Sequence, residues 1–301
     1  MNNRAWLLFA AVSLLWGMPY LFIKVAIEDL SPVFVVFGRT AIAAAVLIPI
    51  ALARGVLGAL RGHLKLVLAL SLVHIVVPFV LITYGELHIT SSLTGLIIAV
   101  EPVVVGLMLM RSDPFTPVRV VGLALGFGGV ALLTGLELGG DRWGLLGAGM
   151  VALATVGYAY ATILIQRHGA GIPPTALVTG TQITSALLLA PFAVLTWPTA
   201  PVRPASWSSV VVLGVFCSAL ALMAFYTLIG EIGPNKAGLV TYVNPVVAVA
   251  LGVAVLHEPL RLSLLIGSAL ILTGCALATR PARRRPALEP VNSVPASGTG
   301  G

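Results

Sequence analysis

The sequence predicts an all-α integral membrane protein in which ten transmembrane helices form two inverted five-helix repeats. Three observations favour this fold class: an apolar composition, ten apolar runs long enough to span a membrane, and matching residues in the two halves. Of the 301 residues, 58% are hydrophobic and only 9% are charged, and the mean hydropathy is +1.06. Soluble domains carry about a quarter charged residues. This composition therefore excludes a water-soluble globule, a nucleic-acid binder with a basic surface and a disulfide-stapled secreted domain.

The ten predicted spans follow from run length, because a membrane-crossing helix needs about 20 mostly apolar residues. The runs lie at 5–27, 32–53, 65–86, 91–110, 117–136, 143–165, 174–197, 207–229, 236–256 and 262–279. Continuous runs favour helices, because the strands of a membrane barrel would alternate over about 10 residues. The connections between the runs are too short to hold a soluble domain.

The basic residues predict the orientation of these spans. With the N-terminus inside, the inner segments carry most of the 17 Lys and Arg residues, while the outer segments hold only Arg142, Arg203 and Arg261. We therefore expect a multi-pass protein of the inner or plasma membrane with both termini cytoplasmic. The tail 280–301 is rich in Arg, Pro, Ser and Gly. It is expected to be disordered and to lie against anionic headgroups.

The two halves match at a nearly constant offset, beginning with Pro32 and Gly38, which correspond to Pro174 and Gly180 at an offset of 142. Further matches are Ser13, Trp16, Tyr20 and Lys24 with Thr155, Tyr158, Thr162 and Gln166; Glu101-Pro102 with Asn244-Pro245; and Asp113-Pro114 with Glu258-Pro259. We expect the repeats at 5–136 and 143–279. Five spans per repeat invert the second copy relative to the first, an architecture found in many secondary transporters.

Several of these residues also resemble a known family. In the first half they are Trp16-Gly17, Lys24, Arg39 and Glu101-Pro102; in the second they are Ile232-Gly233-Pro234, Ala237-Gly238, Asn244-Pro245 and His257-Glu258-Pro259, followed by Gly267 and Gly274. In this order they resemble the EamA family of the drug/metabolite transporter superfamily, over about residues 5–279. The resemblance implies a ten-helix secondary transporter, usually an exporter of small metabolites such as amino acids. It does not fix the substrate.

Glu101 is the first candidate for substrate binding and for proton coupling, because ionisable residues inside a membrane are costly and usually functional. Pro102 removes a backbone N–H and frees the carbonyl group of Ile98 at the same depth. Glu101 can then bind a substrate ammonium group or carry a proton. The alternative is a protonated or hydrogen-bonded glutamate that packs a kinked helix.

A second proline motif, Asn244-Pro245, frees the carbonyl group of Thr241 in the ninth span. Thr241 and Asn244 lie on one helical face, so they are candidates for the neutral half of a pseudo-symmetric substrate site. A plain structural kink is the alternative.

Arg39 is a candidate ligand for a substrate carboxylate, because its planar guanidinium group can bond two oxygens. It lies about 10 Å below the outer boundary at 1.5 Å per residue, and Glu101 lies about 15 Å below it. These depths also permit an Arg39–Glu101 pair. The third alternative is an arginine that snorkels to the outer interface.

Three aromatic residues are candidates to line the substrate cavity: Trp16, Tyr20 and Tyr158. Aromatic faces can stack on a ring or on a cation, although packing is the ordinary role of such residues. Lys24 lies near its helix end, where snorkelling or pairing with Glu28 at i+4 is expected.

His74 is a second candidate for proton coupling, because histidine titrates near physiological pH. It lies mid-span on one face with Ser71 and Pro78, and a neutral packed histidine is the alternative. The remaining motifs are given structural roles. His257-Glu258-Pro259 is expected to form a turn, and Gly122 and Gly126 a site of close helix packing.

The predicted function is secondary transport by alternating access, in which one five-helix unit rocks against the other. The expected partners are the lipid bilayer and a small zwitterionic or organic metabolite; a homodimer stays open, and no nucleic acid, metal or cofactor is expected. The chain lacks a GxxxxGK[ST] loop for ATP. An uptake carrier is one alternative. A channel would favour a ring of polar groups, and an enzyme a cluster of catalytic residues, and neither pattern occurs.

Overall fold

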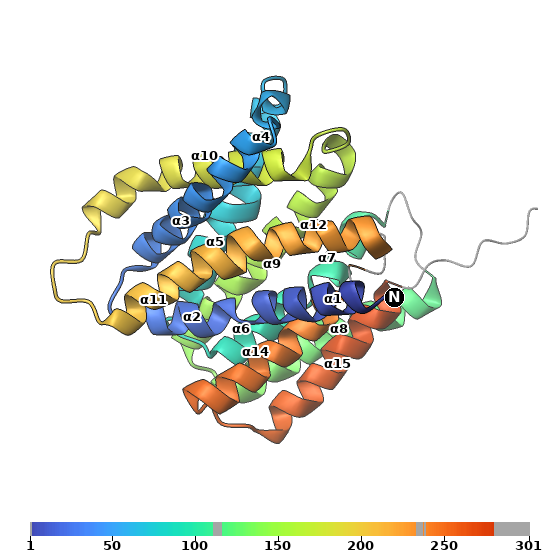
Figure 1. Ribbon diagram of the computed structural model, residues 1–301. Coiled ribbons are helices and arrows are strands. Elements are labelled where there is room, and N and C mark those ends of the chain that lie inside the picture. Colours follow the sequence, from blue (N-terminus) through green and yellow to red (C-terminus); the bar gives the residue numbers. More distant parts are fainter. Residues whose placement is uncertain (1, 111–115, 233–236, 238, 280–301) are drawn as a thin grey trace, which may run out of the picture.

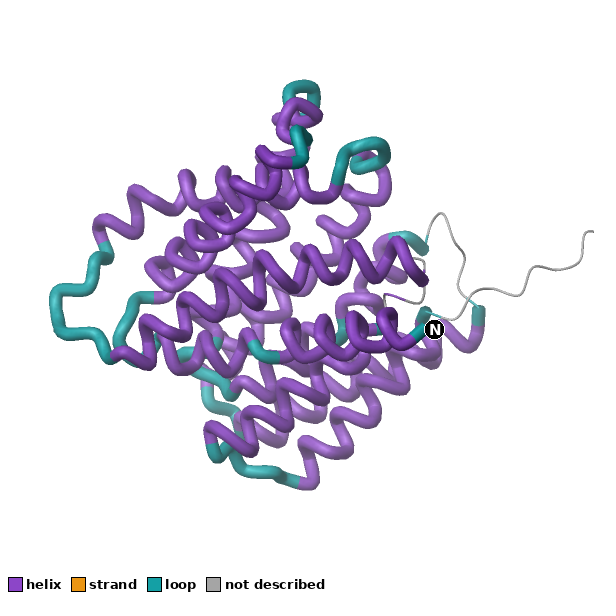
Figure 2. Tube along the Cα trace, in the orientation of Figure 1, coloured by secondary structure: helices purple, strands orange, loops and turns teal. Residues whose placement is uncertain are grey.

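The computed structural model describes residues 2–110, 116–232, 237 and 239–279. These residues form helices joined by short turns and contain no strand (Figures 1 and 2). Several sequence predictions lie outside the described residues: the matched pair Asp113-Pro114, the family-like residues Gly233-Pro234 and Gly238, and the tail 280–301.

The first half of the chain contains five apolar segments, three of which are interrupted. In order, they are α1 (Asn3–Gly17) with α2 (Pro19–Ala26); α3 (Pro32–Ala53); α4 (Leu64–Leu70), the π-helix η2 (Ser71–Val76) and α5 (Val77–Gly85); α6 (Ser91–Ile98) with α7 (Glu101–Met108); and α8 (Pro117–Leu138). A short 3₁₀ helix, η1 (Leu57–Leu60), precedes α4.

The second half repeats this order of segments. It consists of α9 (Arg142–His168); α10 (Pro174–Leu195); α11 (Pro204–Val212), the π-helix η3 (Leu213–Leu220) and α12 (Ala221–Ile232); α14 (Val240–Leu256); and α15 (Leu262–Ala278). Both π-helices therefore lie in the third segment of their half.

Eight segments of the described chain are long and apolar enough to cross a membrane. They coincide with the first eight predicted runs, and so confirm a multi-pass arrangement. The last two runs coincide with α14 and α15, which are apolar but only 17 residues long.

Local sequence explains where the helices begin. The hydroxyl groups of Ser31 and Thr90 accept hydrogen bonds from the backbone N–H groups of Phe34 and Leu93, both at 3.2 Å. Each hydroxyl satisfies one of the free N–H groups in the first turn of a helix. Pro32 occupies the first position of α3, where its missing N–H costs nothing.

The packing interleaves the two halves. Helix α8 packs along α15, α3 along α10, and α6 along α14. In addition, α1 contacts α12 and α14 of the second half, while α9 contacts α5 and α7 of the first. Figure 1 shows α1 and α2 in blue beside α11 and α12 in orange. The first helix of each half thus belongs to the packing of the other half.

The α8–α15 contact depends on glycine, and confirms the packing role expected of Gly122 and Gly126. A Cβ atom on Gly122 would lie 2.4 Å from the backbone nitrogen of Ala278, and one on Gly274 would lie 2.4 Å from that of Gly126. Real Cβ atoms do not approach so closely. The two backbones therefore touch only because these positions lack side chains.

The turns gather at two ends of the bundle. One end, which we call the Arg203 end, contains the turns 27–31, 86–90, 139–141, 196–203 and 257–261. The opposite end, which we call the Arg61 end, contains the turns 54–63 and 169–173. Contacts between turns that are distant in sequence hold the Arg203 end together.

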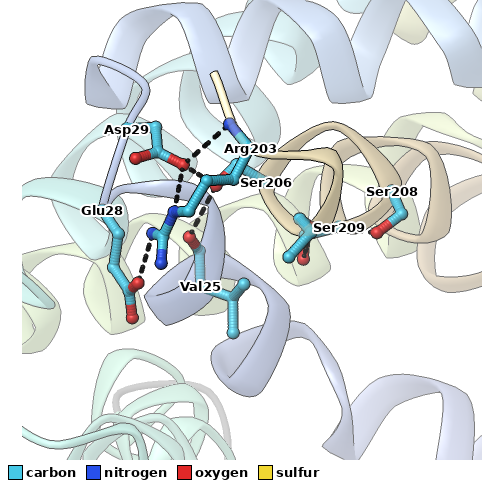
Figure 3. Close-up of polar contacts among 8 residues, drawn as sticks. Val25, Glu28, Asp29, Arg203, Ser206, Ser208 and Ser209 are labelled. Carbon is cyan, nitrogen blue, oxygen red and sulfur yellow. Dashed lines mark hydrogen bonds and ion pairs between the residues drawn. The ribbon is translucent and has the colours of Figure 1, made fainter. Parts of the chain in front are cut away.

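Arg203 forms several of these contacts (Figure 3). Its Nε donates to the carboxylate of Asp29 at 2.8 Å, and its terminal nitrogen pairs with Glu28. The hydroxyl group of Ser206 donates to the same Asp29 carboxylate at 2.5 Å. These bonds tie the turn after α2 to the beginning of α11. We call this cluster, formed by Glu28, Asp29, Arg203 and Ser206, the Arg203 clasp.

Candidate functional site

Breaks in the helices place polar groups inside the bundle. Pro78 cannot donate a hydrogen bond to the carbonyl group of His74, and Pro102 cannot donate to that of Ile98. The first missing bond falls where the π-helix η2 passes into α5, and the second where α6 ends before α7. π-Helical segments and interrupted helices of this kind are frequent at functional sites.

Arg39 is buried among these breaks, with 8% of its surface exposed. Its Nε donates a hydrogen bond of 2.9 Å to the hydroxyl group of Ser218 in η3. Its guanidinium carbon lies 3.9 Å from the centre of the Phe79 ring, a cation–π contact. Of the three guanidinium nitrogens of Arg39, only Nε donates a hydrogen bond to a described residue. The terminal nitrogens therefore keep the planar fork that suits a carboxylate.

Aromatic rings surround this buried cation. The ring of Tyr158 lies edge-on to the rings of His74 and Phe79, with centroid separations of 5.6 Å and 6.5 Å. Tyr158 also lies within electrostatic range of Tyr20 and Arg39. The structure thus brings together four predicted site residues, Tyr20, Arg39, His74 and Tyr158, from four different spans. We call this group the Arg39 cluster, together with Phe79 and Ser218.

Glu101 lies at the first position of α7, immediately after the break in the fourth span. Its carboxylate accepts a 2.9 Å hydrogen bond from the hydroxyl group of Thr162 in α9. The permitted ion pair with Arg39 does not form, because Ser218 and Phe79 hold the guanidinium group elsewhere. Glu101 nevertheless lies within electrostatic range of Tyr20 and Tyr158, and so borders the Arg39 cluster.

Asn244 lies in a different environment, at the contact between α14 and α1. With its amide oriented so that the nitrogen donates, it bonds the carbonyl oxygens of Val240 at 2.9 Å and Ser13 at 3.2 Å. Helix α14 continues through Pro245 without the break seen at Pro102. Thr241 lies half-buried on the same helix. The Asn244 amide is thus engaged in joining two helices.

Trp16 also lies at a helix contact. Its ring is 4.6 Å from the ring of Phe225 in α12, measured between centroids. Trp16 and Asn244 therefore both join α1 to the second half of the chain.

Lys24 does not form the ion pair with Glu28 that its i+4 spacing predicts as one of two roles. Glu28 is bound by Arg203 instead (Figure 3). The ammonium group of Lys24 donates to the backbone carbonyls of Glu86 and Ile89, the latter at 2.8 Å. This contact joins α2 to the turn between the third and fourth spans.

Four residues of this region were not predicted as site residues: Phe79, Glu86, Thr162 and Ser218. Ser218 and Phe79 carried no signal, because their partner Arg39 is distant in sequence. Glu86 lay at the edge of an apolar run, where an acid is usually solvated, yet the structure buries it completely. Thr162 did carry a signal, since it shares a helical face with Tyr158.

Two hollows lie at opposite ends of the bundle. The hollow at the Arg203 end has a volume of about 370 Å³, and its lining includes Lys24, His88, Thr90, Glu137 and Arg261. The hollow at the Arg61 end has a volume of about 810 Å³, and its lining includes Arg61, His63, Lys65 and His168.

The described residues contain no group of His, Cys, Asp and Glu that could hold a metal ion.

Comparison with known proteins gives consistent results. The chain is 28% identical to the uncharacterized transporter YvbV of Bacillus subtilis, over 97% of each chain. It is 26% identical to the uncharacterized inner membrane transporter YedA of Escherichia coli K12, over 83% of this chain and 82% of that one. A crystal structure with 23% identity shares the fold, with a TM-score of 0.66 over 93% of this chain and 97% of that one.

The sequence profile of the EamA-like transporter family matches the chain twice, at residues 3–135 and again at 145–280. The two matches cover most of the sequence. Together with the eight span-length segments, they identify a multi-pass membrane transporter, and the chain belongs to the EamA-like transporter family.

Proposed function

We propose that this protein is a secondary transporter that exports a small zwitterionic or organic metabolite by alternating access, coupled to protons. The observation that carries the proposal is the Arg39 cluster. The buried guanidinium group of Arg39 lies over the ring of Phe79, which packs against Tyr158. Tyr20 and Glu101 lie within electrostatic range of Tyr158, and all of these residues belong to segments long enough to span a membrane. Intramembrane charges of this kind mark transport pathways in membrane proteins.

The chemistry of the cluster favours an amphoteric substrate. The terminal nitrogens of Arg39 suit a carboxylate, because two parallel N–H groups can meet its two oxygens. Glu101 suits an ammonium group or a proton, and its bond to Thr162 uses one of its two oxygens. The rings of Tyr20 and Tyr158 supply apolar and polar surface between these charges. Trp16, Thr241 and Asn244 stay candidate substrate ligands on the α1–α14 side.

We further propose that all ten predicted segments cross the membrane as two inverted repeats. Seventeen residues lie at the lower limit for a spanning helix, so α14 and α15 are long enough. The two family matches and the reciprocal contacts, α1 with α12 and α9 with α5, support a repeat at this period. Because the halves interleave, a rocking body would include the first helix of the other half.

The proposed orientation puts the Arg203 end outside and both termini in the cytoplasm. The bias of Lys and Arg toward the other segments supports this choice. Residues such as Arg61 and Lys65 at the Arg61 end would then face the anionic headgroups of the inner leaflet.

Solute flux driven by a pH gradient tests proton coupling. Purified protein in proteoliposomes is given labelled pools of amino acids, organic cations or sugars, with and without the gradient. We expect one pool to respond to the gradient, and Glu101→Gln to abolish that response while leaving the protein folded. Glu137→Gln is the matched control, because Glu137 pairs with Arg261 near the end of α8.

An unchanged response to the gradient in Glu101→Gln would contradict the role of Glu101. Gradient-independent flux in the wild type would favour the alternative of a facilitative uptake carrier. Either result leaves membership of the transporter family intact, since that rests on the sequence comparison.

A further inference from the structure

Glu86 is a buried acid whose carboxyl group takes part in none of the contacts described above. It follows the last residue of α5, and its backbone N–H bonds the carbonyl group of Ile82 at 2.9 Å. Its side chain is entirely enclosed, with 0% of the residue exposed. Neither carboxyl oxygen has a hydrogen-bond partner among the described residues.

Such a carboxyl group is far more stable with a proton than without one. An ionised carboxylate in a closed site loses its hydration and needs paired charge or hydrogen bonds in return. Glu86 has neither in this conformation. A neutral carboxylic acid loses much less on burial. The geometry therefore favours a Glu86 that holds a proton.

Lys24 lies next to this acid but does not pair with it. Its ammonium group donates to the backbone carbonyls of Glu86 and Ile89, so it clasps the turn 86–89 against α2. Because one of these carbonyls belongs to Glu86 itself, the ammonium group can reach the carboxyl group by rotation of the two side chains. No helix has to move for this exchange of partners.

The other charged and titratable groups near Glu86 are Glu258, Arg39 and Tyr20. Glu258 accepts from the backbone and hydroxyl groups of Ser91 and Ser92 at the start of α6. Arg39 is held by Ser218, and Tyr20 lies on the same helix as Lys24. Lys24 is the cation that already contacts Glu86, through its backbone carbonyl, and so is the one placed to compensate an ionised Glu86.

The hollow at the Arg203 end brings solvent to the Lys24 contact beside this acid, although Glu86 itself does not line the hollow. Lys24 and Ile89 line the hollow, and both take part in the clasp on the turn. A proton that leaves Glu86 can thus enter the solvent beside Lys24. The net change is loss of one proton from the carboxyl group, with the charge of Lys24 unchanged.

We propose that Glu86 is a proton-binding site at the Arg203 end, and that Lys24 clasps the turn 86–89 only while Glu86 is protonated. Loss of the proton draws Lys24 to the carboxylate and releases the turn. The site rests on the proposed function only for its use in transport, where it would link proton release to opening of this end.

Infrared difference spectroscopy of the purified full-length protein tests the proton site without any substrate. Acid-minus-alkaline spectra of the wild type should contain the carbonyl band of a protonated carboxylic acid, and Glu86→Gln should lose one such component. Glu137→Gln is the control and should keep it. If Glu86→Gln does not fold, Glu86→Asp should shift the band. A band unchanged in these Glu86 variants would overturn the proposal.

Spin-label mobility at position 87 tests the contact between Lys24 and the turn 86–89. Leu87 is 45% exposed, so Leu87→Cys accepts a label, while Cys217 and Cys275 are buried. Raising the pH should mobilise the label in the wild-type background and leave it immobile with Glu86→Gln. With Lys24→Met it should be mobile at every pH. Equal pH dependence with and without Glu86 would overturn the clasp, whatever the flux measurements show.

Discussion

Arg39 places a positive charge in the interior of the bundle. Its surroundings explain why it is tolerated there: a ring face lies against the guanidinium plane, and one N–H is bonded to Ser218. These contacts position the guanidinium group and leave its terminal N–H groups available for a ligand. At the same scale, Glu101 and Glu86 show two different solutions for an acid. The first accepts a bond from Thr162, whereas the carboxyl group of the second has no hydrogen-bond partner in the part of the chain that the structure describes.

Arg39→Lys should weaken transport of carboxylate-bearing solutes. Lysine keeps the charge but loses both the planar stacking on Phe79 and the Nε donor to Ser218. We expect at least a tenfold rise, or about 1.4 kcal/mol, in the half-saturation concentration measured by solute flux. Arg142→Lys is the matched control, because Arg142 also lies over a ring, Trp143 at 5.4 Å, but is exposed. Equal effects of both changes would contradict the assignment of Arg39.

The Arg203 clasp should make stability depend on pH in acid. Hydrogen bonds from Ser206 and Arg203 hold the pKa of the Asp29 carboxyl group below its ordinary value of 3.8. Because the folded state has the lower pKa, the resulting stability is present above about pH 4 and is lost as pH falls through the folded-state pKa.

Thermal unfolding in detergent micelles checks this sign. The midpoint of Asp29→Asn should lie below that of the wild type near neutral pH, and the difference should shrink below about pH 4. Ser208→Ala is the control, because Ser208 lies in the same turn of α11 but bonds only the carbonyl group of Ala205. A wild-type advantage that persists to the lowest pH at which both proteins are folded would contradict the clasp.

At the scale of elements, the glycine contact between α8 and α15 predicts a sharp position dependence. Gly274→Ala should destabilise the protein by about 1–3 kcal/mol, because the new Cβ atom would meet the backbone of Gly126. Gly128→Ala should be neutral or slightly stabilising, since no atom lies within 4 Å of its Cβ position. Thermal unfolding of the two variants makes the comparison. Equal midpoints would mean that α8 and α15 do not touch through Gly274.

The same scale shows how far the sequence predicts the structure. Span positions were predictable because length and apolarity are local properties, and eight runs coincide with span-length segments. The break before α7 was predictable because Pro102 removes a specific bond. The interruption of α11–α12 by η3 was not, since no proline marks it. The Arg39–Ser218 bond was not predictable either, because 179 residues separate its partners.

The candidate site, like the fold, was predictable from the sequence only in part. Tyr20 and Tyr158 were predicted as aromatic residues of two matching sets, one in the first span of each half, and the structure places them near each other and near Arg39. Asn244 was predicted by symmetry with Glu101, yet its amide bonds the carbonyl group of Ser13. Pairs of helices that the repeat makes equivalent thus carry different side chains and different contacts. The sequence shows that Arg39 and Glu101 both lie in the first half, but it does not show which residues contact them.

At the scale of the whole molecule, two features fit a carrier. The halves interleave through α1 and α9, so neither half of the chain is an isolated body. Hollows lie at both ends, and the charged Arg39 cluster lies within the spans that join these ends. A pore that conducts ions would instead present a continuous polar path. The arrangement therefore supports access from one side at a time.

Counterflow of a labelled solute in proteoliposomes tests this account most directly. Vesicles loaded with unlabelled amino acids, organic cations or sugars are diluted into the same labelled solute, without any gradient of pH. A carrier with alternating access accumulates label transiently, and the account predicts this overshoot for one solute class and its reduction in Arg39→Lys. Label that only equilibrates, at a rate that does not saturate with concentration, would contradict the account and indicate a channel.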